Sequence, residues 1–254
     1  MSHTIGCSVK EMREYCPCRV DFDMTGIIAG EMAGMFPGRT IEVALYDESG
    51  KKCYGRSFGT DTCASHYEEI VPRGRYTVSA VIVRKDSEEM NSERIAPHHG
   101  GQIDSLYGIS APLDATGEEA AAALEAYKQF ATVSIKLLSA PGNTEIHLSA
   151  PSSSVFRQSL HATGDKLEIS SEYDGGISSF RILRQDGYDL ALNFINLLTG
   201  ERIASIDLGP RLKEIGYDFS AADLADIIII ADLDRGMASI TVDGWQEELL
   251  FIIF

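Results

Sequence analysis

The sequence of 254 residues lacks an apolar run long enough to cross a membrane as a helix. Such a helix needs about 18–20 consecutive apolar residues, whereas the longest runs, IIII at 227–230 and LLFIIF at 249–254, have the length of a strand. Basic residues are also few, because 22 Lys and Arg stand against 38 Asp and Glu and give a formal net charge of −16. This balance disfavours nucleic acid, whose affinity depends on cations that neutralise phosphates. We therefore predict no nucleic-acid partner.

Motifs of catalysis and of cofactor binding are missing as well. The chain contains neither of the glycine-rich phosphate motifs GxGxxG and GxxxxGK[ST], nor the nucleophile motif GxSxG. His98-His99 has no acidic residue at a suggestive spacing, which favours a solvated loop. Asp232-Leu-Asp234-Arg-Gly236 lacks the oxygen ligands and closing Glu of a calcium loop and indicates a hairpin turn. The sequence predicts no catalytic residue, no metal and no cofactor, and we expect that the protein is not an enzyme.

Alternating apolar residues dominate what is present. Val20, Phe22 and Met24 alternate with charged or polar residues, as in a half-buried strand, and TIEVALYDESGKKCYGRSF at 40–58 predicts a hairpin. The segment 75–83 is apolar on both faces, which is typical of a central strand. Turn signals recur about every ten residues with little helix between them, a pattern typical of β-sandwiches. The final run LLFIIF predicts either a last core strand or a strand that pairs with another subunit.

One helix is predicted near the middle of the chain. Thr116-Gly-Glu-Glu119 matches a capping box before AAAALEAYKQF, so local propensity predicts a helix to about Lys128. The shift in composition there suggests three parts: a leader and tether at 1–17, an N-terminal β-sandwich at 18–128 and a C-terminal β-sandwich at 129–254. The polar segment 84–118 is long for a loop and is interpreted as functional, flexible or partly strand.

The cysteines pose a separate question, because their number is odd: Cys7, Cys16, Cys18, Cys53 and Cys63. Residues 1–7 lack the basic and long apolar regions of a complete signal peptide, yet Thr4-Ile5-Gly6-Cys7 is similar to the end of a bacterial lipoprotein signal. In such signals a Cys after small residues receives the lipid. Cys7 is therefore either an ordinary N-terminal cysteine or a lipid-attachment residue.

Cys16-Pro17-Cys18 has three interpretations. A zinc site would need two more ligands, which Cys53 and Cys63 could supply, but the spacing is unusual for zinc. A redox centre would need C-x-x-C spacing in a βαβ setting. In an exported protein, structural disulfides that join the leader to the hairpin explain the same residues more simply. We treat Cys16, Cys18, Cys53 and Cys63 as candidate disulfide cysteines of open connectivity.

Four segments together are similar to one family. They are CSVKEMREYCPCRVDFD, VPRGRYTVSAVIV, GQIDSLYG and the series LNFINLLTGERIASIDLG, GYDFSAADLADIIIIADLD and ASITVDGW. In order and spacing they resemble the FimB/Mfa-type fimbrillin-related lipoproteins of Bacteroidota, across nearly the whole chain. The resemblance implies a mainly β protein with two tandem transthyretin-like β-sandwich domains and few short helices.

The resemblance also implies a function. It predicts a surface-exposed lipoprotein of the cell outer membrane, anchored through a lipid on Cys7, that acts as a fimbrial anchor or minor fimbrial subunit. Its partners would be other fimbrial subunits, which it would join by pairing of β-strands. The alternative is a surface adhesin or glycan-binding module on the same fold, which would expose a cluster of aromatic residues such as Tyr67, Tyr107, Tyr173 and Tyr188.

Overall fold

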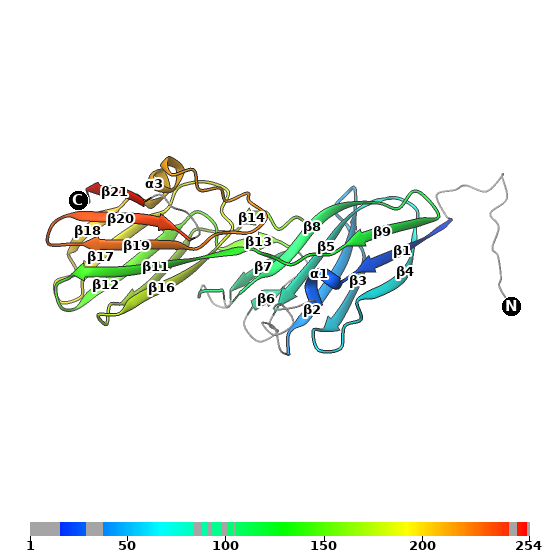
Figure 1. Ribbon diagram of the computed structural model, residues 1–254, viewed down its shortest axis with the longest axis horizontal. Helices are drawn as coiled ribbons and strands as arrows, with labels where there is room; N and C mark the ends of the chain where they lie inside the picture. The colour runs from blue at the N-terminus through cyan, green and yellow to red at the C-terminus, as the bar shows by residue number, and fades with distance from the viewer. Residues whose placement is uncertain are drawn as a thin grey trace. The chain divides into compact units, whose positions relative to one another are not determined.

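The chain folds almost entirely into strands (Figure 1). A computed structural model describes residues 16–28, 38–83, 88–90, 93–97, 101–103, 105–243 and 248–252. Two short helices occur in these ranges, α1 (Thr25–Ile28) and α3 (Leu208–Glu214). The predicted mainly β class with few short helices is therefore confirmed.

Two compact units divide the chain. The first comprises Met1–Lys85 and Gly108–Ala126, and the second comprises Asp86–Tyr107 and Tyr127–Phe254. The segment 86–107 thus belongs to the second unit, together with the residues from 127 onward.

The first unit contains two sheets. A three-stranded sheet has the order β4-β1-β9, and a five-stranded sheet has the order β10-β8-β5-β2-β3. The strands are β1 (Pro17–Asp23), β2 (Thr40–Asp47), β3 (Lys52–Gly59), β4 (His66–Pro72), β5 (Arg75–Val83), β8 (Tyr107–Asp114) and β9 (Glu119–Ala123), while β10 (Tyr127–Lys128), which pairs at the end of the five-stranded sheet, falls in the residue range of the second unit. Strands β2 and β3 form the predicted antiparallel hairpin, and β5 is the central strand with both faces largely buried, as expected.

The second unit contains a five-stranded sheet of order β16-β11-β19-β20-β21 and two four-stranded sheets, β15-β12-β17-β18 and β14-β13-β7-β6. Its strands are β6 (Glu88–Met90), β7 (Arg94–Pro97), β11 (Phe130–Ser139), β12 (Thr144–Ala150), β13 (Ser154–Phe156), β14 (Ala162–Thr163), β15 (Leu167–Glu172), β16 (Ile177–Leu183), β17 (Ala191–Asn196), β18 (Arg202–Ile206), β19 (Ile227–Asp232), β20 (Met237–Val242) and β21 (Glu248–Ile252).

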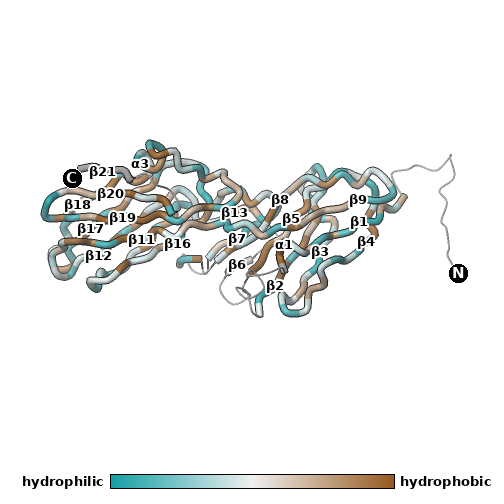
Figure 2. The backbone as a smooth tube through the Cα atoms, in the orientation of Figure 1, coloured by the Kyte–Doolittle hydropathy of each residue, from teal (hydrophilic) through white to brown (hydrophobic). Residues whose placement is uncertain are grey.

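One apolar core lies between two of these sheets. Ile135 and Ile229 come from the five-stranded sheet, Leu148 and Phe194 come from the sheet β15-β12-β17-β18, and all four are buried in the same cluster. Figure 2 shows the apolar character along β11 and β19. The second unit is thus a β-sandwich, held together by the non-directional burial of these side chains.

The two units repeat one strand order. In the first unit, β4-β1-β9 is one layer and β8-β5-β2-β3 belongs to the other; in the second unit, β16-β11-β19 and β18-β17-β12-β15 take the same places in the same chain order. In both units the first strand pairs antiparallel with one neighbour and parallel with the last strand of the repeat. The second unit then adds β20 and β21 beyond β19.

Aspartates end several strands in the same way. Strands β1, β2 and β8 end at Asp23, Asp47 and Asp114, and each carboxylate accepts a hydrogen bond from the backbone N–H two residues later. A Ser or Thr at that position adds its hydroxyl at Asp47 and Asp114. These local bonds compete with the ladder and favour a turn.

The predicted helix at 116–128 is wrong, and the aspartate turn explains why. The hydroxyl of Thr116, expected to cap a helix, donates instead to Asp114 at 2.6 Å. The following residues pair as β9 in parallel with Arg19–Asp23 of β1. Ala122, Leu124 and Ala126 are buried alternately, with a period of two. Tertiary pairing thus overrides the helix propensity of the alanines.

A close backbone approach fixes the start of α3. The N–H of Gly209 donates to the carbonyl oxygen of Leu190 at 3.0 Å, and a Cβ on residue 209 would overlap the carbonyl oxygen of Tyr188. We expect Gly209→Ala to lower the free energy of unfolding by about 2–3 kcal/mol, since the backbone must move apart. Gly187→Ala is the matched control, because its Cβ would meet nothing within 4 Å. Equal urea midpoints for the two variants would contradict this prediction.

Candidate functional site

The predicted cysteine site is only partly brought together. Cys16 and Cys18 lie next to each other at the start of β1 and are buried, while Cys53 lies on β3 and Cys63 follows that strand. Cys18, Cys53 and Cys63 are free thiols. Cys16 is disulfide-bonded, and its partner lies outside the described residues. The structure therefore joins none of these four cysteines to another.

The three free thiols have the character of structural residues. Burial raises the pKa of Cys18, Cys53 and Cys63 above the ordinary value, and for Cys53 the neighbouring Asp47 raises the pKa further. A reactive cysteine has a lowered pKa, because the thiolate is the nucleophile and the metal ligand. These surroundings do not match a redox or zinc centre, and among the described residues no group of three potential ligands gathers to hold a metal ion.

The remaining residues of interest are scattered. Cys7, His98, His99 and Trp245 lie outside the described residues, so the lipid-attachment role of Cys7 stays a prediction. Asp232 forms the expected turn, since its carboxylate accepts from the N–H of Arg235 at 3.1 Å.

The four tyrosines considered for an adhesin do not form an exposed cluster. Tyr67 lies on β4, Tyr107 begins β8, Tyr173 follows β15 and Tyr188 lies between β16 and β17, and each is only partly exposed. Tyr67 instead stacks on Phe22 with ring centroids 4.7 Å apart. The aromatic residues therefore support packing and do not present a sugar-stacking platform.

An apolar patch crosses the outer face of the sheet β16-β11-β19-β20-β21. The cross-strand register places Ile177, Lys136, Ile230, Ser239 and Leu250 in one row across all five strands. Ile177 is 64% exposed and Leu250 is 65% exposed, on the two edge strands of the sheet. Two-residue steps along the strands place further apolar side chains on this face. We define the apolar patch as Leu138, Ile177, Ile228, Ile230, Met237 and Leu250.

The sequence alone did not predict the apolar patch. The run IIII at 227–230 has the length of a strand, as expected, but only Ile227 and Ile229 are buried, while Ile228 is 40% exposed. A strand with one solvated face normally alternates apolar and polar residues. The outward isoleucines of β19, Ile228 and Ile230, were the sequence feature that could have revealed the patch. Exposed apolar residues that lie together are typical of an interaction surface.

The run LLFIIF partly forms β21, which within the described ranges pairs with β20 alone and is an edge strand. It therefore presents a strand edge for pairing. The first unit offers a second edge, because within the described ranges β9 pairs with β1 on one side and no strand on the other. In the second unit the equivalent strand β19 is covered by β20.

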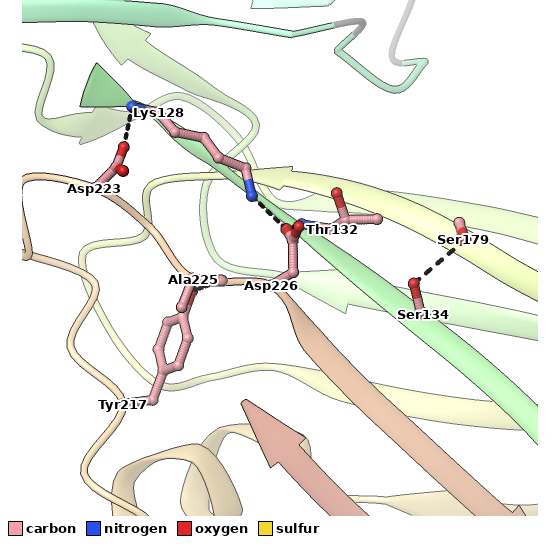
Figure 3. A network of polar contacts seen from close by, with 8 residues as sticks. All are labelled: Lys128, Thr132, Ser134, Ser179, Tyr217, Asp223, Ala225 and Asp226. Carbon is pink, nitrogen blue, oxygen red and sulfur yellow. Dashed lines mark hydrogen bonds and ion pairs between the residues drawn. The ribbon is translucent and has the colours of Figure 1, made fainter. Parts of the chain in front are cut away.

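A carboxylate network fixes the entry of β19 beside β11 (Figure 3). Asp226, just before β19, accepts hydrogen bonds from Nζ of Lys128 at 2.5 Å and from the N–H of Thr132 at 2.6 Å. Asp223 accepts from the N–H of Lys128 at 2.5 Å, and the hydroxyl of Tyr217 donates to the carbonyl oxygen of Ala225 at 2.7 Å. The network sets the register of the parallel pair on which the apolar patch lies.

A buried guanidinium holds the same loop from the other side. Arg184 donates to Oε1 of Gln129, to the carbonyl oxygen of Phe219 at 2.5 Å and to that of Ala222 at 3.2 Å. Burial lowers the pKa of Arg184, yet four donor contacts to oxygen atoms compensate the cation for lost water. Loop 217–226 is therefore a rigid support.

Solved structures match this architecture over nearly the whole chain. The fimbrial anchor protein Mfa2 from Porphyromonas gingivalis aligns with a TM-score of 0.64 at 15% sequence identity, covering 94% of this chain and 100% of that one. The protein has the fold of a fimbrial anchor. The resemblance to FimB/Mfa-type proteins is thereby confirmed at the level of the fold.

Two further structures share this fold. A candidate polysaccharide-binding protein from Bacteroides thetaiotaomicron has a TM-score of 0.63 at 15% identity, covering 93% of this chain and 98% of that one. A candidate adhesin from Bacteroides ovatus has a TM-score of 0.62 at 13% identity, covering 92% and 95%. No protein-family model and no curated protein sequence matches the chain. In the described part of the chain no helix is long and apolar enough to span a membrane.

We expect Asp226→Ala to destabilise the second unit by about 1–3 kcal/mol, because it leaves the N–H of Thr132 and the ammonium of Lys128 without their acceptor. Asp234→Ala is the control, since it removes the same charge from the exposed turn at the other end of β19. Urea denaturation followed by far-UV circular dichroism measures both. A midpoint for Asp226→Ala equal to that of the control would contradict the role of the network.

Proposed function

We propose that the protein is a non-enzymatic fimbrial anchor or minor fimbrial subunit. It is held at the cell outer membrane as a surface lipoprotein through Cys7, and it joins other subunits by pairing of β-strands. Its two units are tandem transthyretin-like β-sandwiches. The observation that carries this proposal is the match to the fimbrial anchor Mfa2, which extends over 94% of this chain and all of that protein.

The repeated strand order supports strand pairing. The second unit contains an internal example of the contact, because β20 lies antiparallel beside β19. The equivalent edge in the first unit belongs to β9, where no described strand takes the place of β20. A strand from another subunit would satisfy the same row of backbone N–H and C=O groups.

The apolar patch supports a second contact. It lies on the face of the sheet that ends in β21, so a neighbour that pairs with that edge would also cover exposed apolar side chains such as Leu250. Burial of apolar area is the main favourable contribution to stable association. Edge pairing and patch burial would therefore act together.

An adhesin is the alternative function. The likeness to a candidate adhesin and to a candidate polysaccharide-binding protein favours it. The four half-buried tyrosines give it no support, because they form no exposed cluster. A fimbrial subunit that also binds a ligand would unite the two functions.

The lipid anchor is tested by metabolic labelling with an alkyne-bearing fatty acid in cells that express the full gene from its own locus. We expect the wild type to carry the label in the outer-membrane fraction and Cys7→Ser to lose it, since the thioether needs the sulfur. Cys63→Ser, which removes a free thiol, is the control and keeps the label.

The mass of the N-terminal peptide gives an independent result. A Cys7 that carries a lipid on its sulfur has no thiol left for a disulfide, so the peptide mass distinguishes the two states. An unlabelled wild type, or a Cys7→Ser variant that remains labelled, would overturn the anchor proposal.

Strand pairing at β9 is tested by removing one outward N–H. The carbonyl of Glu118 accepts from Arg19, and the N–H of Leu124 donates to Asp23, so even-numbered residues of this segment bond to β1. The N–H of Ala121 therefore faces the open edge. We expect Ala121→Pro to reduce cross-linking to fimbrial subunits at least about ten-fold, because proline removes the donor and blocks strand addition.

Ala121→Thr keeps the N–H and is the matched control. Both variants are expected to retain the wild-type circular dichroism spectrum, because proline is tolerated at the free side of an edge strand. Wild-type cross-linking of a folded Ala121→Pro variant would show that β9 is not the pairing edge.

A further inference from the structure

A polar recess lies on the outer face of the sheet β15-β12-β17-β18 in the second unit. Its volume is about 450 Å³, which falls within the roughly 300–1,000 Å³ of small-molecule sites. Polar and charged side chains dominate its lining: His147, Ser149, Lys166, Glu168, Asn193 and Arg202. The apolar patch lies on the other sheet, so the recess is a separate surface.

The register builds the recess across all four strands. His147 on β12 stands directly opposite Ser170 on β15 and Asn193 on β17, which places these three side chains in one row. Arg202 on the edge strand β18 pairs with Ile195 of β17. Lys166 immediately precedes β15 at the opposite edge. The recess thus has a hydrogen-bonding floor, with Arg202 at one edge strand and the ion pair of Lys166 and Glu168 at the other.

Most of the charged groups are already partnered. Nζ of Lys166 lies 2.9 Å from Oε1 of Glu168, and this contact lowers the pKa of the carboxyl. Glu145 lies 2.6 Å from Nε2 of His147 and accepts from the hydroxyl of Ser170 at 2.9 Å, and these bonds lower its pKa too. The carboxylates of Glu145 and Glu168 are therefore ionised at neutral pH and satisfied by the protein, and a third carboxylate, that of Glu172, stands opposite Glu145 on the same face.

Two donors on the same face have no partner. Among the described residues the side chains of Asn193 and Arg202 form no hydrogen bond or ion pair, although both line the recess. A guanidinium offers a planar set of N–H donors that matches a carboxylate, and an amide can bond to hydroxyl groups as donor or acceptor. The unsatisfied capacity is thus for one carboxylate with neighbouring hydroxyls.

We propose that this recess binds an acidic oligosaccharide, with a sugar carboxylate on Arg202 and sugar hydroxyls on Asn193, His147 and Ser149. The ligand is extended, because Arg202 and Lys166 stand on strands three spacings apart, or about 14 Å at ~4.8 Å per strand. An apolar ligand does not fit, since Ile195 is the one outward apolar side chain among the lining residues. Simple phosphate would use the guanidinium but leave the floor unused.

The experiment uses isothermal titration calorimetry on the folded chain with three acidic probes: tetragalacturonate, a hyaluronan tetrasaccharide and 3′-sialyllactose. Methyl-esterified tetragalacturonate and lactose are the neutral partners of two of them, and inorganic phosphate tests for simple anion binding. We expect at least one acidic probe to bind, its neutral partner to bind at least about ten-fold more weakly, and the affinity to fall with salt as charged contacts are screened.

Arg202→Ala is expected to weaken that binding at least about ten-fold, a loss of about 1.4 kcal/mol or more. Lys136→Ala, which removes one exposed positive charge from the opposite sheet, is the matched control and keeps wild-type affinity. Asn193→Ala weakens acidic and neutral probes alike. The proposal is overturned if no acidic probe binds at about 1 mM, the weak end of specific recognition. It is also overturned if inorganic phosphate binds with the same affinity as the acidic probe, or if Arg202→Ala and Lys136→Ala have the same affinity.

Discussion

The parallel pairing of a first strand with a distant last strand is the contact on which each unit depends. In the first unit β1 pairs with β9, and in the second β11 pairs with β19, about a hundred residues apart in each case. Such pairing brings a large entropic cost of loop closure before any contact forms. The pairing persists because the two sheets of a unit bury an apolar core between them, and because polar groups fix the register of the paired strands. In the second unit this register is set by Asp226, which bonds to residues on either side of the start of β11.

The same pairing has a different consequence in the two units. In the second unit the chain continues beyond β19 into β20 and β21, so the sheet grows and its new edge is apolar. In the first unit the chain leaves the sheet after β9, and no described strand pairs with the outer edge of β9. A single repeated topology therefore yields one extended sheet with an apolar patch and one open edge. Surfaces of these two kinds are what a subunit of a linear assembly needs, since each subunit must contact a neighbour on two sides.

Local patterns in the sequence were sufficient for much of the fold. Alternation at Val20, Phe22 and Met24 predicted β1, because period-two burial is a property of each strand alone. The failures occurred where distant partners decide. Residues 119–123 have the propensity of a helix but gain more from pairing with β1, a contact that no local pattern encodes.

The site residues were harder to predict for the same reason. Ile228 and Leu250 are far apart in sequence and become one patch only through the register of three strands. Arg202 likewise pairs with Ile195, two residues from Asn193 along β17, and a lone Arg in an acidic chain carries no signal. The lipid-attachment role of Cys7, by contrast, rests on four letters of sequence and stays a prediction, since it would be read from an extended peptide and needs no fold.

The charge of the chain sharpens the significance of the polar recess. At a net charge of −16 the protein repels anions at long range, but at physiological salt that repulsion is screened beyond about 8 Å. Recognition of an anion must therefore come from short-range contacts, in which direction and hydrogen bonding matter more than total charge. On the outer face of β15-β12-β17-β18, Glu168 is paired with Lys166 and Glu145 contacts His147, whereas Arg202 has no carboxylate partner among the described residues. The apolar patch needs a partner that excludes water, whereas the recess needs one that replaces it, so the two outer faces of one sandwich are suited to different classes of molecule.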